Sequence, residues 1–230
     1  MKSVIVNNKR VYAFTSKKEL LDFIIDKNKI LIAINAEKII LKSDEITEII
    51  NANIGYSDGI GSVLALKRKG VKTIKIAGAE LWLDIIRRFE GNKSVYLLGS
   101  TKTVIEKTVS LLQRDYPKLN IVGYRDGYFK EDEKANILKD IKTLSSQIVF
   151  VALGSPRQEF LMADFIKEHS ALYMGLGGSF DVYSGEKKRA PIFYQRLGLE
   201  WFYRFLKEPS RISRHKRIVY FFVKLALNKL

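Results

Sequence analysis

Short apolar runs alternate with amphipathic segments along most of the chain. Runs of strand length predict buried strands, and they occupy residues 29–35, 94–98, 120–124, 147–153 and 172–176. Apolar positions at helical spacing predict helices over residues 43–51, 59–69, 102–116, 132–145 and 157–170. Strand, glycine turn and helix follow one another at least three times. This order predicts an α/β fold with a mostly parallel sheet and right-handed crossovers.

Glycine-containing turns follow several of these strands. In open parallel sheets, ligands bind in the crevice outside the carboxyl ends of the strands, so these turns are the first candidates for a site. Gly99-Ser100 and Gly123 are the weaker cases. Residues 51–61 are expected to form the most polar loop of the N-terminal half, and they contain the segment Ser57-Asp58-Gly59-Ile60-Gly61.

Asp58 is the first candidate for chemistry. A carboxylate on a glycine turn at a helix start can approach a ligand closely, and it could take a proton from a sugar hydroxyl. The spacing alone also fits an aspartate that caps the following helix.

The second candidate is the turn Gly154-Ser155-Pro156-Arg157-Gln158-Glu159, which follows a strongly apolar strand. Free amides at such a turn suit a phosphate or a sugar hydroxyl, and Gln158 offers both a donor and an acceptor. Glu159 fits a structural role near the helix N-terminus, where negative charge is favourable. An ordinary strand-to-helix turn explains the same residues.

The third candidate is Gly175-Leu176-Gly177-Gly178-Ser179-Phe180-Asp181. Gly177 and Gly178 allow a close approach to a ligand, and Asp181 could bind a ribose hydroxyl or a base. A turn followed by a helix cap is the structural alternative. The spacing is not that of a Rossmann dinucleotide fingerprint, and the chain has no Walker A motif.

Composition narrows the classes of protein. The chain has 230 residues, of which 47% are hydrophobic and 28% charged, as in a globular protein of one domain, or of one domain with an appendage. It has no cysteine and only two histidines, which argues against thiolate chemistry and histidine metal centres. Its first ten residues are too polar for a signal peptide, and no stretch is apolar enough to span a membrane. We therefore expect a cytoplasmic setting.

The net charge of +15 is concentrated near the C-terminus. Residues 187–230 hold twelve basic residues against Glu200 and Glu208, a net charge of +10. We expect a domain over residues 1–186 and a basic, aromatic, helical appendage over 187–230. Its composition suits an interfacial helix on anionic lipid, an RNA-binding surface, or a segment packed on the domain with solvated charges. Non-specific nucleic-acid binding, or a non-catalytic subunit of a membrane complex, therefore stays open beside an enzyme.

The turns belong to a series of seven short blocks. They are INAE at 34–37, SDGIG at 57–61, GSPRQE at 154–159, GLGGSFD at 175–181, KRAP at 188–191, LGLEWFYR at 197–204 and EPSR at 208–211. In order and spacing, over about residues 1–217, these blocks resemble the WecG/TagA/CpsF family of bacterial glycosyltransferases, in particular its TagA-like N-acetylmannosaminyltransferase group.

The resemblance implies a single Rossmann-like domain with a C-terminal appendage. It implies an inverting transferase that moves N-acetylmannosamine or a related hexose from a UDP-sugar to a sugar on a polyprenyl diphosphate. Such reactions build teichoic acid, capsule or exopolysaccharide at the inner face of the cell membrane, where the enzyme would be peripherally bound. It could be a homo-oligomer.

The resemblance also implies roles for individual residues. Asp58 would be the catalytic base, with Asn35, Gln158 and Arg204 beside it. Substrate binding would fall to the remaining matched positions, which are Lys75, Gly154, Ser155, Gly177, Gly178, Asp181, Arg211 and Arg214. The chain lacks an Asp-x-Asp motif, so no cofactor or metal is expected, and arginines and amides would neutralise the leaving diphosphate. Ala33, Lys75 and Glu80 depart from the usual threonine, arginine and aspartate of the family.

Overall fold

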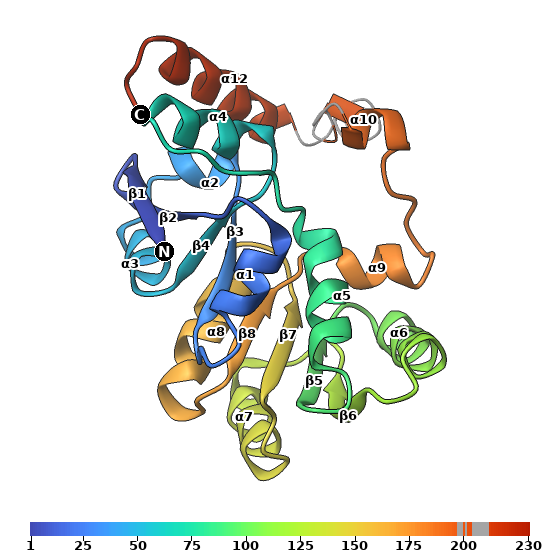
Figure 1. Cartoon of the computed structure of the whole chain (residues 1–230). Helices are drawn as coiled ribbons and strands as arrows, with labels where there is room; N and C mark the ends of the chain where they lie inside the picture. Colours follow the sequence, from blue (N-terminus) through green and yellow to red (C-terminus); the bar gives the residue numbers. More distant parts are fainter. Residues whose placement is uncertain (197–199, 201, 204–211) are drawn as a thin grey trace.

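The computed structural model describes residues 1–196, 200, 202–203 and 212–230. An eight-stranded sheet runs through the middle of the molecule in the order β1-β2-β4-β3-β8-β7-β5-β6 (Figure 1). All of the paired strands are parallel except β1 and β2, which form an antiparallel hairpin. The strands are β1 (Lys2–Val6), β2 (Lys9–Ala13), β3 (Ile30–Ile34), β4 (Ile54–Ser57), β5 (Ser94–Gly99), β6 (Asn120–Arg125), β7 (Ile148–Ala152) and β8 (Leu172–Gly175).

Helices cover both faces of this sheet. One hydrophobic cluster joins the sheet to α2 (Ala36–Ile40), α3 (Asp44–Ala52), α4 (Ile60–Arg68), α7 (Lys134–Thr143), α8 (Arg157–Glu168) and α12 (Ile212–Ala226). The other cluster joins it to α1 (Lys17–Phe23), α5 (Gly78–Phe89), α6 (Lys102–Asp115) and α9 (Ser179–Tyr183). A 3-10 turn η1 (Glu131–Glu133) precedes α7, and α10 (Ile192–Arg196) follows α9. The expected α/β class and a single Rossmann-like domain are confirmed.

The burial of the central strands explains why short apolar runs predicted them. Every residue of β7 is buried, as expected for a strand with helices on both faces. The predicted strands and helices all occur, with ends shifted by one or two residues.

One expectation is wrong. Residues 51–61 do not form a loop, because Ile54–Ser57 is the buried strand β4, paired with β3 on one side and β2 on the other. The segment IGYS is short and contains a glycine, so it has little strand signal of its own. Its pairing and burial come from tertiary structure.

The C-terminal segment contains the helices α10 and α12, whereas residues 187–191 and 227–230 are not helical. Helix α12 lies beside α2 and α4 (Figure 1). Ile218 and Phe221 are buried, and a Cβ added at Gly61 of α4 would lie 3.1 Å from the Phe221 ring. Arg68 of α4 donates a hydrogen bond to the Ala226 carbonyl at 3.1 Å. The boundary at residue 186 stays a prediction. Among the described residues, no helix combines the length and apolarity that a membrane crossing requires.

Candidate active site at the carboxyl edge of the sheet

The predicted turns come together at one edge of the molecule. Strands β4, β3, β8, β7 and β5 are consecutive neighbours, and all run in the same direction. Their carboxyl ends therefore meet along one line. Asp58 follows β4, Asn35 follows β3, Gly177 follows β8, and Gly154 follows β7. The three turns chosen from the sequence, together with Asn35 from the resemblance, thus lie on four adjacent strands.

Asp58 sits between β4 and α4. Its backbone N–H donates to the Ile34 carbonyl at 2.9 Å, which fixes the turn against the end of β3. The residue that caps α4 is Gly59, with a φ of +87°, so the capping position falls one residue after Asp58. Asp58 is partly exposed. Burial raises the pKa of the neighbouring Tyr56 phenol well above its usual value, and the negative charge of Asp58 raises that pKa further.

Asn35 has a structural contact in the structure. Its side-chain oxygen accepts a hydrogen bond from the Lys38 backbone N–H at 2.9 Å, which caps the short helix α2. Asn35 therefore lies at the sheet edge as expected, and its carboxamide oxygen already accepts one hydrogen bond within the protein.

Gln158 and Glu159 open helix α8 and are both buried. The Gly177 backbone N–H donates to Gln158 Oε1 at 3.0 Å, so the turn after β7 is joined to the turn after β8. Glu159 lies in the first turn of α8, near the helix N-terminus as expected, and it is buried there. Its Oε1 pairs with Lys38 Nζ at 2.6 Å, and the two side chains are only 2% and 8% exposed respectively.

Two glycines of these turns have a backbone conformation that favours glycine. Gly154 and Gly177 have φ values of +76° and +57°, and a Cβ at either would meet no atom within 4 Å. Their backbone conformation, rather than crowding, favours glycine. Gly178 and Ser155 are exposed at the same edge. The bond between Ser155 and Pro156 is cis.

Asp181 begins a second polar cluster beyond β8. Its Oδ2 accepts a hydrogen bond from Ser100 Oγ at 3.3 Å, and its Oδ1 pairs with Lys187 Nζ at 3.2 Å. Ser100 follows β5 with a φ of +59°. The weak sequence signal at Gly99-Ser100 thus marks a turn that contacts a stronger candidate.

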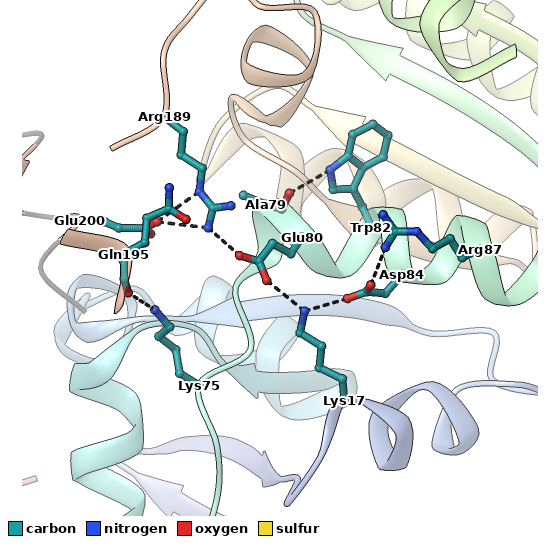
Figure 2. Close-up of polar contacts among 10 residues, drawn as sticks. All are labelled: Lys17, Lys75, Ala79, Glu80, Trp82, Asp84, Arg87, Arg189, Gln195 and Glu200. Carbon is teal, nitrogen blue, oxygen red and sulfur yellow. Dashed lines mark hydrogen bonds and ion pairs between the residues drawn. The ribbon is translucent and has the colours of Figure 1, made fainter. Parts of the chain in front are cut away.

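Lys75 lies on the segment that leads into α5 and contacts the C-terminal segment. Its Nζ donates to the Gln195 carbonyl at 2.7 Å (Figure 2). The Lys75 ammonium group, to which the resemblance assigns substrate binding, therefore donates a hydrogen bond to a main-chain oxygen of α10.

A partly exposed ionic network lies near this contact. It consists of Lys17, Glu80, Asp84, Arg189 and Glu200, and we call it the root network. Figure 2 shows Arg189 between Glu80 and Glu200, at 3.0 and 3.1 Å, and Lys17 between Glu80 and Asp84, at 2.9 and 3.0 Å. Partial burial raises the pKa of Glu80, but the hydrogen bonds and charges of Lys17 and Arg189 outweigh it and lower that pKa overall. Burial opposes the charge of Lys17, yet Glu80 and Asp84 raise its pKa.

The three expected arginines are not placed. Arg204 and Arg211 lie outside the described residues, and Arg214 falls within α12 without a described side chain. Over residues 1–196, 200, 202–203 and 212–230, no three His, Cys, Asp or Glu side chains gather where a metal ion could be held.

Sequence reasoning missed Lys38, Lys17 and the partners of Arg189. Lys38 follows the INAE block by one position, but nothing in the local pattern shows that a lysine will be buried. Only the tertiary fold brings it to Glu159.

Comparison with known proteins bears on the chemistry of this edge. The model of the family described as glycosyl transferase WecG/TagA/CpsF matches residues 6–230, nearly the whole chain. The match favours sugar transfer over the nucleic-acid-binding alternative.

Proposed function

Because this chain belongs to the WecG/TagA/CpsF family of glycosyltransferases, we propose that it transfers a hexose, such as N-acetylmannosamine, from a UDP-sugar to a sugar on a polyprenyl diphosphate. The observation that supports this most is the convergence of Asp58, Asn35, Gln158 and Gly177 at the carboxyl ends of four adjacent strands. This is where an open parallel sheet binds nucleotides and sugars. The products belong to teichoic acid, capsule or exopolysaccharide synthesis.

Asp58 acts as the general base in this proposal. Its carboxylate takes the proton of the acceptor hydroxyl as that oxygen attacks the anomeric carbon of the donor. The bond from the anomeric carbon to the diphosphate oxygen breaks, UDP leaves with the electron pair, and one in-line displacement inverts the configuration. Partial exposure of Asp58 at a glycine turn leaves it accessible to a substrate hydroxyl.

The leaving diphosphate carries negative charge that must be stabilised. We assign this to backbone amides of the turns and to Arg204, Arg211 and Arg214, as expected from the sequence. Lys75 sits at the junction between the domain and α10, so its bond to Gln195 couples the placement of that segment to the sheet edge. No cofactor is assigned.

Helix α12 supports a peripheral membrane role. While Ile218 and Phe221 face the domain, Val219, Val223 and Leu227 are between 50 and 60% exposed. Val219 and Val223 are four residues apart and so lie on one side of α12, and Leu227 follows at the same spacing just after its last residue. Lys216 and Arg217 are exposed on the same helix. Apolar residues with neighbouring cations suit the headgroup region of an anionic leaflet.

Sugar transfer is tested directly with labelled UDP-sugars, UDP-N-acetylmannosamine among them, and a polyprenyl-diphosphate-linked N-acetylglucosamine in anionic vesicles. We expect product from one donor and a loss of at least about 100-fold in kcat for Asp58→Asn. Asp164→Asn, an exposed aspartate of α8 paired with Lys167, is the control and should keep wild-type turnover. Normal turnover in Asp58→Asn would remove that residue from the role.

Membrane binding is tested separately by vesicle flotation. Val223→Asp should reduce binding to vesicles that contain phosphatidylglycerol, because it places a charge in the apolar side of α12. Asn228→Asp, which adds the same charge beyond the helix, is the matched control. Equal binding by Val223→Asp and wild type would contradict a role for this surface.

A further inference from the structure

A continuous chain of polar contacts links three of the turns at the sheet edge. It starts at Lys38 in α2 and passes through Glu159 and Gln158 in α8 to Gly177 after β8. Lys38 Nζ meets Glu159 Oε1 at 2.6 Å, and Gln158 Nε2 donates to the same oxygen at 3.3 Å. Gly177 N–H donates to Gln158 Oε1 at 3.0 Å. The chain therefore crosses from β3 to β7 and β8.

Glu159 determines which way the Gln158 amide faces. An ionised carboxylate only accepts hydrogen bonds, so the neighbouring side of the amide must be its NH₂ group. The opposite side is then the oxygen, which can accept from Gly177. A reversed amide would place an oxygen against the carboxylate and an NH₂ group against the Gly177 N–H. Both contacts would be repulsive, so one charge fixes two hydrogen bonds.

The burial of this pair calls for an explanation other than stability. Removing two charges from water is costly, and apolar residues of similar volume often stabilise a fold as well as a buried ion pair does. Ile39, next to Lys38 in the sequence, and Leu161 and Met162, on the same helix as Glu159, are apolar and buried, so an apolar replacement would match the core that these helices join. What an apolar pair could not do is orient Gln158.

We propose that Lys38 and Glu159 are positioning residues for sugar transfer. Resting on the proposed function, they hold the Gln158 amide in one orientation and, through it, keep the Gly177 turn in place. With one Nε2 hydrogen used by Glu159 and one Oε1 lone pair used by Gly177, the second hydrogen and the second lone pair of Gln158 point in fixed directions. The donor sugar or its diphosphate meets an amide that needs no reorientation during the reaction.

A double-mutant cycle on the full-length protein tests this. Lys38→Met with Glu159→Leu removes both charges and fills the space with apolar atoms. We expect kcat to fall about 10- to 100-fold, the scale of a misplaced active-site group, while KM for the donor stays within about threefold. In the Gln158→Ala background, the same replacement should change kcat by less than about twofold, because its target is gone.

The matched control is Lys142→Met with Glu168→Leu, which removes an exposed ion pair at the other end of α8. It should leave kcat unchanged. If the buried replacement lowers kcat by the same factor in the wild-type and in the Gln158→Ala background, the proposal is overturned. The pair would then affect turnover without acting through Gln158.

A second measurement needs no activity. Hydrogen exchange of the Gly177 amide in the unliganded protein should accelerate about tenfold in the buried double variant, since its acceptor is no longer held in place. The control variant should leave this exchange unchanged. Unaltered exchange at Gly177 in the buried variant would overturn the proposal. Absence of transfer by the wild-type protein would instead count against the proposed function, so the two failures are distinguishable.

If the double variant does not fold, Glu159→Gln takes its place in both measurements. It keeps the shape and an oxygen for Lys38 but removes the charge that orients Gln158. Faster Gly177 exchange in this variant supports the proposal, and unchanged exchange contradicts it.

Discussion

The molecule uses ion pairs in two different ways. Lys38 and Glu159 form one pair at the sheet edge, with almost no exposure to solvent. The root network joins the domain to the C-terminal segment, and its side chains are 20 to 43% exposed. The first pair is shielded from salt and fixes geometry. The second is partly screened by water and ions, so its strength changes with the solution.

This difference separates the two parts of the proposed site. The sheet edge is held by buried contacts that salt screens much less. The start of the C-terminal segment is attached through contacts that salt and acid weaken, while α12 is attached again through the buried Phe221. The arrangement suits an enzyme whose core site is preformed and whose appendage meets a charged surface.

The largest expected effect is the loss of one partner of the buried pair. Lys38→Met leaves the Glu159 carboxylate buried and unpaired, which should lower the free energy of unfolding by about 3–5 kcal/mol. Urea denaturation measures it. Lys142→Met, which breaks an exposed pair, is the control and should stay within about 0.5 kcal/mol of wild type. Similar small changes in both variants would show that the two kinds of pair are not different.

Loss of the packing of α12 against the domain should lower the free energy of unfolding by a comparable amount. Phe221 is fully buried against α2 and α4, so Phe221→Ala should lower the free energy of unfolding by about 3–5 kcal/mol. Tyr220→Ala removes an aromatic ring from the exposed side of the same helix and should cost about 0.5 kcal/mol or less. If the two variants lose the same stability, α12 is not attached as the structure has it.

A smaller effect is expected at the root network. Arg189→Met removes contacts to both Glu80 and Glu200, yet the partial exposure of these groups limits the loss to about 1 kcal/mol. The difference from wild type should shrink as sodium chloride rises from about 0.1 to 1 M, because screening weakens the wild-type contacts. A difference that does not depend on salt would contradict an electrostatic attachment.

The smallest effect depends on pH. The pKa of Glu80 is lowered in the folded protein, so its ionised form stabilises the fold above its usual pKa of about 4.3, and this stability is lost as pH falls through the lowered value. Glu80→Gln should therefore be less stable than wild type at pH 7 by under about 1 kcal/mol, and this difference should be smaller near pH 3. Denaturation at both pH values measures this. A difference that grows on acidification would have the wrong sign.

Much of the fold could be predicted because the central strands are short apolar runs between amphipathic helices. The hairpin Lys2–Ala13 and strand β4 were missed, since their residues are mixed in polarity and their burial depends on neighbours. Helix α5 was also missed, although its buried residues Leu81, Trp82, Ile85, Ile86 and Phe89 follow a helical spacing.

The site could be predicted only in outline. A parallel sheet brings strand ends together, so turns such as those of Asp58 and Gly177 could be placed at one edge from the order of elements alone. The orientation of Gln158 could not be predicted, because it depends on the buried Glu159 carboxylate, whose partner Lys38 lies 121 positions away in the sequence. No local sequence pattern predicts the ion pair between Lys38 and Glu159.

The most direct test of the account is hydrogen exchange with saturating UDP on the full-length protein. We expect protection in the turns that contain Asn35, Asp58, Gly154 and Gly177, and none at the opposite ends of the same strands. Protection limited to those opposite ends, or to the surface of α12, would show that the nucleotide binds elsewhere and would contradict an active site at the carboxyl edge of the sheet.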